Sequence, residues 1–261
     1  MPMIDDFTPI IHHLDGRTIR LWAVADVHLG ARECDQRGFE KFLDKIASDD
    51  DSYMIIDGDL LNNATRSSVS NIFEETMPPS AQIDVATELL NPVADKILCV
   101  VGGNHEARSR KDTDLDPLYA VCSMVRRSDG SCLQDIYRQN MAFIRIVLGD
   151  SSPKDNYAIM VTHGKGINKR KQFQAIVEGV DACIFAHTHT PDVLRPARIR
   201  FTSSNRVKTH NIVSLTCSSF LEPGGYSLQN LYTPQATSLP QCLELEFTGT
   251  NRRDGQIRVI W

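Results

Sequence analysis

Five apolar segments of this sequence each end at side chains that bind metals. They are segments 21–25, 54–56, 100–101, 159–162 and 183–186, followed in turn by Asp26-Val27-His28, Asp57-Gly58-Asp59, Gly102-Gly103-Asn104-His105-Glu106, His163-Gly164 and His187-Thr188-His189. Polar atoms at the end of a buried strand must all be satisfied, so a fold gains nothing from crowding Asn and His there. The glycine pair before Asn104 lets the backbone turn sharply and approach a bound group closely. We therefore expect five strand ends to converge on one site.

Segments whose apolar residues recur at helical spacing lie between these expected strands. The large apolar residues of one expected helix share a face: Phe39, Phe42, Leu43 and Ile46. Asp116-Pro117 is typical of a helix N-cap followed by proline at the first helical position. Other helices are expected near residues 83–90, 118–125 and 173–180, and other strands near 142–148, 211–217, 242–247 and 256–260. Strands that alternate with helices are typical of βαβ units, so the predicted fold class is α/β.

The sequence contains no internal repeat and no low-complexity linker, so we expect one domain over residues 1–261. Length alone would allow one domain or two. Residues 1–18 are expected to be a lead-in with little recognisable structure. Residues 19–190 form the α/β body that carries all five motifs, and residues 191–261 form a β-rich part of the same sandwich.

Charge, cysteine content and hydrophobic segments indicate where the protein is found and which partners it binds. A formal net charge of −5 argues against a protein that coats nucleic acid indiscriminately, while leaving room for a local basic patch. Seven scattered cysteines without a C-x-x-C pair indicate free thiols and a reducing compartment. The first residues do not resemble a secretory signal peptide, and no apolar segment is long enough to span a membrane. We expect a cytoplasmic protein of a cell or a phage-infected cell, with no membrane partner; the sequence leaves its oligomeric state open, a homodimer included.

The candidate ligands form a mixed set of carboxylate, amide and imidazole groups. They are Asp26, His28, Asp59, Asn104, His163, His187 and His189, with His105 beside them. No thiol belongs to the set, which argues against a closed structural zinc site. Such a set suits Mn²⁺, Fe or Zn²⁺ without choosing among them, and manganese is the working expectation. The ligands are too many for one catalytic metal that also binds water, whereas two divalent ions about 3.5–4 Å apart, sharing one carboxylate, accommodate them.

The five motifs, in this order and each at a strand end, resemble the calcineurin-like metallophosphoesterase superfamily from Asp26 to His189. The resemblance implies a four-layer α/β/β/α sandwich and a metal-dependent phosphoesterase. It implies two metal sites that share Asp59, one formed by Asp26, His28, Asp59 and His189 and the other by Asp59, Asn104, His163 and His187. His105 would face the scissile phosphate and either stabilise its charge or protonate the leaving oxygen. Glu106 is expected to support the ligands rather than bind metal.

Two positions depart from the common pattern of that superfamily, and neither removes an expected ligand. Asn62 stands where a second Asp often follows the bridging one, and Ala186 stands where Gly often begins the last motif. The Ser/Thr protein phosphatase branch is disfavoured, because it carries Asp-Arg-Gly where this chain has Asn62-Asn63-Ala64 and Arg where it has Gly102. The Asp26-Val27-His28-Leu29-Gly30 form is closer to the DNA-break-repair nuclease branch, over a short stretch.

Basic residues follow two of the motifs. One group is Arg108, Arg110 and Lys111, and the other is Lys165, Lys169, Arg170 and Lys171. Such groups suit a substrate with several phosphates, so we expect a phosphodiesterase of nucleic acid, DNA or RNA, and assign the first group to substrate binding. The second group is as well explained by a solvated face. A second hypothesis is a phosphomonoesterase or an enzyme for small cyclic nucleotides. A third is an inactive binding scaffold, against which the intact ligand set argues.

Overall fold

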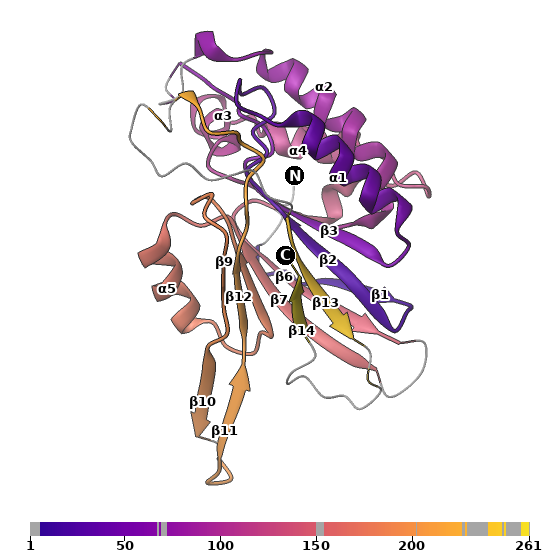
Figure 1. The fold of residues 1–261 in the computed structure, drawn as a ribbon, viewed down its shortest axis with the longest axis vertical. Coiled ribbons are helices and arrows are strands. Elements are labelled where there is room, and N and C mark those ends of the chain that lie inside the picture. Colours follow the sequence, from indigo (N-terminus) through magenta and orange to yellow (C-terminus); the bar gives the residue numbers. More distant parts are fainter. Residues whose placement is uncertain are drawn as a thin grey trace.

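The computed structural model describes residues 6–66, 68, 72–149, 154–201, 203–225, 228, 240–246, 248 and 257–260. Two six-stranded sheets pack face to face, with helices outside them, so that the molecule has four layers (Figure 1). The predicted α/β sandwich is thereby confirmed. Within the described ranges, no helix combines the length and the apolar character needed to cross a bilayer.

The first sheet contains the strands that end at Asp26, Asp59 and Asn104. Its order is β14 (Ile257–Ile260), β13 (Gln241–Glu246), β2 (Thr18–Val24), β3 (Ser52–Asp57), β4 (Ile97–Val101) and β5 (Tyr137–Arg138). Strands β2 to β5 run parallel, whereas β13 pairs antiparallel with β2 and with β14. Parallel strands end at the same edge of a sheet, so three of the five motifs meet there.

Helices α1 (Gln36–Ser48), α2 (Pro79–Leu90) and α4 (Pro117–Met124) lie together beside the first sheet (Figure 1). The apolar residues predicted for the first helix are all buried on α1: Phe39, Phe42, Leu43 and Ile46. Asp116 caps α4 as predicted, its carboxylate accepting the N–H groups of Leu118 and Tyr119 at 3.1 Å each. The short 3₁₀ helices are η1 (Ile72–Glu74), η2 (Asn91–Lys96) and η3 (Leu133–Ile136).

The second sheet contains the strands that end at the three later histidines. Its order is β1 (Ile10–Leu14), β6 (Ala142–Leu148), β7 (Asp155–Thr162), β8 (Ala182–Phe185), β12 (Val213–Thr216) and β9 (Asp192–Leu194). Helix α5 (Ile167–Ile176) connects β7 to β8 on the outer side of this sheet. A hairpin of β10 (Ala197–Phe201) and β11 (Val207–Asn211) extends away from the sandwich (Figure 1).

Side chains of the second sheet alternate between two apolar cores, as the two-residue period of a strand requires. The core between the sheets receives, among others, Ile144, Ile146, Ile159, Val161, Ala182 and Ile184. The smaller core beneath α5 receives Met160, Cys183 and Phe185, with Phe143 and Phe173 packed against it. Strands β7 and β8 are therefore fixed on both faces, which holds the histidines at their ends in place.

The lead-in predicted for residues 1–18 contains regular structure. Strand β1 pairs parallel with β6 at the edge of the second sheet, and β2 already begins at Thr18. A helix that was not predicted, α3 (Glu106–Thr113), starts directly after His105. Its exposed residues are almost all polar, so no apolar spacing marks it in the sequence.

The helix predicted near residues 173–180 is displaced, because α5 ends at Ile176. Arg170 and Gln174 are buried on its inner side, and Ile176 is 74% exposed. Two polar residues therefore occupy positions where the apolar pattern would place hydrophobic ones. Strand ends predicted at Phe247 and Gln256 lie outside the described residues.

Candidate metal centre

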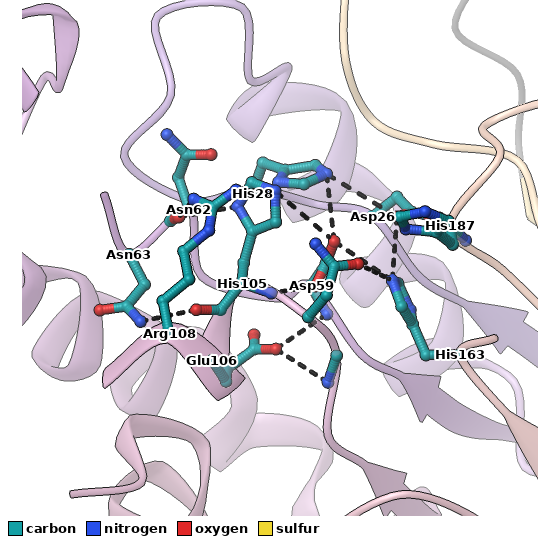
Figure 2. Close-up of polar contacts among 12 residues, drawn as sticks. Asp26, His28, Asp59, Asn62, Asn63, His105, Glu106, Arg108, His163 and His187 are labelled. Atoms are coloured by element: carbon teal, nitrogen blue, oxygen red, sulfur yellow. Dashed lines mark hydrogen bonds and ion pairs between the residues drawn. The ribbon is translucent and has the colours of Figure 1, made fainter. Parts of the chain in front are cut away.

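The five motifs come together where strands of both sheets end (Figure 2). Strands β2, β3 and β4 of the first sheet lead to Asp26, Asp59 and Asn104, and strands β7 and β8 of the second lead to His163 and His187. The two sets are directly connected, because the backbone N–H of His187 donates to Oδ2 of Asp26 at 3.0 Å. The site thus spans the seam between the sheets.

Five of the predicted ligands have a left-handed backbone. The φ angles are 51° at Asp26, 53° at His28, 49° at Asp59, 72° at His187 and 53° at His189. Residues with a Cβ seldom adopt this region, and each instance costs on the order of 1–3 kcal/mol. Such strain persists only where the surrounding structure imposes it, and it concentrates at functional sites.

Asp26, His28 and His189 form one group of potential ligands, with one ligand atom of each within 4.8 Å of the others. Nε2 of His189 lies 3.2 Å from Oδ1 of Asp26, and Nε2 of His28 lies 3.7 Å from the same oxygen. The two Nε2 atoms are 3.3 Å apart. Asp26 is fully buried, and its Oδ1 forms no well-aligned hydrogen bond with the described residues.

Asp59, His163 and His187 form a second such group. Nε2 of His163 lies 3.2 Å from Oδ2 of Asp59 and 3.1 Å from Oδ1 of Asn104. Nδ1 of the same ring lies 2.7 Å from the backbone carbonyl of Asp57, which can only accept a hydrogen bond. Nδ1 therefore carries a proton, and Nε2 is directed into the group.

The carboxylate of Asp59 lies between the two groups. Its Oδ2 is 3.2 Å from Nε2 of His163 and 4.0 Å from Nε2 of His28. Its Oδ1 accepts the backbone N–H of His105 at 2.8 Å. This is the position that a carboxylate shared by two metals would occupy.

The donor set fits a pair of metal cations. Burial alone would raise the pKa of Asp26 and Asp59, yet neighbouring histidines, His163 foremost for Asp59, hold both carboxyl pKa values well below their usual range. Conversely, burial would lower the pKa of His163, but Asp59 and Asp26 raise it well above its usual value. Two buried carboxylates therefore require positive charge beside them. The facing Nε2 atoms of His28 and His189 likewise need a proton or a cation between their lone pairs.

Two glycines allow the loops after β3 and β4 to approach each other. A Cβ added at Gly58, where φ is +75°, would lie 2.6 Å from Cα of Gly103 and 2.7 Å from Nδ1 of His163. A Cβ at Gly103 would lie 2.1 Å from Oδ1 and 2.3 Å from the backbone nitrogen of Asp59. No side chain fits at either position, so both glycines are required by the packing around Asp59.

Glu106, the first residue of α3, joins the same two loops by accepting hydrogen bonds from their backbones. It is fully buried. Its Oε2 accepts the backbone N–H groups of Asp59 at 3.1 Å and Gly103 at 3.0 Å, and its Oε1 accepts that of Leu61 at 3.1 Å. Glu106 thus positions the backbone that carries the shared carboxylate (Figure 2).

His105 is held in one tautomer. Its Nδ1 lies 2.8 Å from the carbonyl oxygen of Asn62, and its Nε2 lies 2.9 Å from Nη2 of Arg108. A carbonyl only accepts and a guanidinium only donates, so Nδ1 carries the proton and Nε2 the lone pair. Burial, with the charges of His28 and Arg108, lowers the pKa of His105 to about 3 despite the opposing charge of Asp59. The imidazole is therefore neutral near pH 7.

Two residues that the sequence did not single out hold the loop after Asp59. Asn63 Nδ2 donates to the carbonyl of His105 at 2.8 Å, and the backbone N–H of Asn63 donates to Oε1 of Gln82 at 2.9 Å. Gln82 lies fully buried on α2. A glutamine within an amphipathic helix gives no sequence signal for this role, because its partner lies in a distant loop.

A cavity of about 510 Å³ opens beside Asn104 and His163, between α3 and α5. Six basic residues line it: Arg108, Arg110, Lys111, Lys165, Lys169 and Arg170. The three residues predicted to bind substrate thus share one cavity, but their surroundings differ. Arg108 also contacts His105, Lys111 is exposed, and Nη1 of Arg110 pairs with Oδ2 of Asp116 at 2.8 Å. The charge of Arg110 is therefore partly neutralised inside the protein.

Two stacked sheets that present Asp and His groups at their joined strand ends, beside a cationic cavity, define a metal-dependent phosphoesterase, a hydrolase of phosphoric ester bonds. The chain belongs to the calcineurin-like phosphoesterase family, whose sequence model matches residues 19–191. The predicted family and enzyme class are thereby confirmed. A search of curated proteins finds no significant match to this sequence.

The chain is similar to several solved structures. GAP50, the anchor in the inner membrane complex of Plasmodium, is 10% identical with a TM-score of 0.50, over 94% of this chain and 88% of that one. A metallophosphoesterase from Sphaerobacter thermophilus is 15% identical with a TM-score of 0.38, over 87% and 84% of the two chains. The nuclease MPE of Pseudomonas putida is 17% identical with a TM-score of 0.35, over 92% and 85%. At 10% identity the similarity to GAP50 concerns the fold alone.

Proposed function

We propose that this enzyme hydrolyses phosphodiester bonds of nucleic acid with two divalent metal ions, manganese in the first instance, that share Asp59. The observation that carries the proposal is the cationic cavity next to Asn104 and His163. Six basic residues gather there in a chain of net charge −5. Arg110 and Arg170 pair with Asp116 and Asp192. A small phosphomonoester would leave Lys111, Lys165 and Lys169 unused, whereas a nucleic acid presents further phosphates beside the one that reacts.

The predicted ligands would hold the two ions in overlapping sets: Asp26, His28, Asp59 and His189 for one, and Asp59, Asn104, His163 and His187 for the other. When bound, such a pair grips the phosphoryl group, generates hydroxide near neutral pH and stabilises the attacking and leaving oxygens. The protein contributes the orientation of its own groups. The Nδ1–H of His163 donates to the carbonyl of Asp57, which fixes the ring with Nε2 directed into the site.

His105 and Arg108 would act on the substrate phosphate rather than on a metal. In the free enzyme, Nη2 of Arg108 donates to Nε2 of His105. We propose that Arg108 redirects this donor to a phosphate oxygen when substrate binds, which frees Nε2. Once Nε2 takes up a proton from solvent, His105 can stabilise charge on the phosphate or donate that proton to the leaving oxygen.

The proposal is tested with purified, manganese-reconstituted protein and four substrates: single-stranded DNA, double-stranded DNA, bis-p-nitrophenyl phosphate and p-nitrophenyl phosphate. We expect metal-dependent cleavage of the diesters, DNA included, and little hydrolysis of the monoester. Asp59→Asn should lose metal and activity together while remaining folded. Asp50→Asn, at an exposed acid that precedes β3 whereas Asp59 follows it, is the matched control. Full activity of the chelated protein or of Asp59→Asn would refute the dimetal mechanism. A preference for the monoester with no DNA cleavage would establish the phosphomonoesterase alternative.

A further inference from the structure

The cationic cavity has the size and position of a substrate subsite. Its volume of about 510 Å³ lies within the roughly 300–1,000 Å³ range of small-ligand sites. Asn104 and His163 form part of its lining, so a phosphate bound at the metal cluster would lie at its edge. From there it continues between α3 and α5, away from the shared carboxylate of Asp59. A substrate whose reacting phosphate lies at the metal cluster would extend into it.

The charges along α5 favour an anionic occupant. Lys165 and Lys169 form no ion pair within the described ranges, and no acidic residue belongs to the cavity lining there. A cleft lined by one sign of charge focuses its field on the ligand. Helix α5 begins after Gly166, which has a φ of 88° and provides no side-chain cap, so the first N–H groups of the helix add positive potential at the same end.

An apolar and aromatic surface lies beside these lysines. Phe173 is half-buried and Phe185 is buried, and both line the cavity. The guanidinium carbon of Arg170 lies 5.7 Å from the ring centroid of Phe185. Arg170 is only 7% exposed, and although its Nη2 pairs with Asp192 at 3.0 Å, its buried Nε has no hydrogen-bond partner in the described structure. Aromatic rings and guanidinium planes are the surfaces on which nucleic-acid bases stack.

We propose that this cavity binds one unpaired nucleotide next to the scissile phosphodiester, with its phosphate at Lys165 and Lys169 and its base against Phe173. The inference rests on the proposed function and adds the substrate class. A volume of about 510 Å³ suits one nucleotide, so the substrate strand would be single-stranded at this point. The enzyme therefore acts on single strands or on duplex ends whose terminal base has left the stack.

The test measures binding of two probes to the metal-loaded protein by calorimetry. The probes are deoxyadenosine 5′-monophosphate and deoxyribose 5-phosphate, which differ only in the base. Stacking of one base corresponds to roughly 5- to 150-fold in affinity, so the nucleotide should bind more tightly by that factor. Phe173→Leu keeps apolar packing beneath α5 but removes the aromatic face, and it should abolish most of the difference between the probes. Lys165→Gln/Lys169→Gln should weaken both probes together.

A matched control removes two charges elsewhere. Arg200 and Lys208 face each other across the exposed β10–β11 hairpin, and their joint replacement by Gln should change neither affinity. Equal affinities of the two probes for the wild-type protein would overturn the subsite, as would a base contribution that survives Phe173→Leu. DNA cleavage without a base contribution would leave the proposed function standing and the subsite refuted. A base contribution without DNA cleavage would support the subsite and refute nucleic acid as the substrate.

Discussion

Replacement of Glu106 by alanine should destabilise the protein strongly while leaving the predicted metal ligands intact. The Glu106 carboxylate is the acceptor for three buried backbone N–H groups, those of Asp59, Leu61 and Gly103. Alanine leaves all three without an acceptor. Each orphaned buried donor costs about 1–3 kcal/mol, so the free energy of unfolding should fall by about 3–9 kcal/mol. A whole domain is stable by only about 5–15 kcal/mol.

Glu106→Gln provides a milder version of the same perturbation. Its single carbonyl oxygen can take the place of Oε2 and accept from Asp59 and Gly103. Its NH₂ group must then face the N–H of Leu61, where two donors oppose each other. One orphaned donor costs about 1–3 kcal/mol, so Gln should fall between the wild type and alanine.

Urea denaturation followed by circular dichroism, in the presence of a chelator, measures both variants without a contribution from bound metal. Glu88, an exposed glutamate on α2, supplies the control, because its replacement by alanine should change stability by no more than about 0.5 kcal/mol. If Glu106→Ala is as stable as Glu88→Ala, the three hydrogen bonds do not have the role assigned to them. Metal affinity of Glu106→Ala should also fall, because the backbone N–H of Asp59 loses its acceptor.

Three further outcomes are expected at the metal centre and its cavity. His105→Ala should retain both metals by elemental analysis and lose roughly 10²–10⁴-fold in rate, less with a leaving group of low pKa if His105 is the proton donor; loss of metal would make it a ligand instead. Burial would lower the pKa of His163, but Asp59 raises it well above its usual value, so this ring is protonated near pH 7 without metal. Metal binding should therefore release protons, seen by calorimetry in buffers of different ionisation enthalpy, and should weaken as pH falls; binding without proton release would contradict this. Joint replacement of Arg108 and Lys111 by Gln should reduce the slope of log K for DNA binding against log salt concentration by about 0.7–0.9 for each phosphate that the variant no longer neutralises. An unchanged slope would mean that neither residue contacts a phosphate.

The convergence of the motifs was predictable because it depends on topology more than on detail. Once Asp26, Asp59 and Asn104 each follow a strand of one parallel sheet, their side chains must lie at one edge of that sheet. The strand predicted over residues 142–148 has the same bounds in β6, whose burial alternates at first and becomes continuous over its last three residues.

Other features depended on partners that are distant in sequence. Two of the three backbone donors to Glu106 lie 45 and 47 residues earlier, so no local pattern reveals the extent of its role. Arg170 and Gln174 lie on the buried side of α5. The helix was predicted too far along the chain, because a prediction from apolar spacing treats such polar residues as exposed. Strand β1 was missed because only Ile10 of its five residues is fully buried, as an edge strand allows.

The division of the predicted ligands between the two sheets also bears on how the protein holds together. The first sheet supplies Asp26, Asp59 and Asn104, and the second supplies His163 and His187. An ion bound by both sets is a reversible cross-link between segments that are distant in the sequence. Its contribution to the free energy of unfolding grows with the free metal concentration as RT ln(1 + [M]/Kd). Metal supply would then set the resistance of the sandwich to proteolysis and heat as well as its rate of turnover.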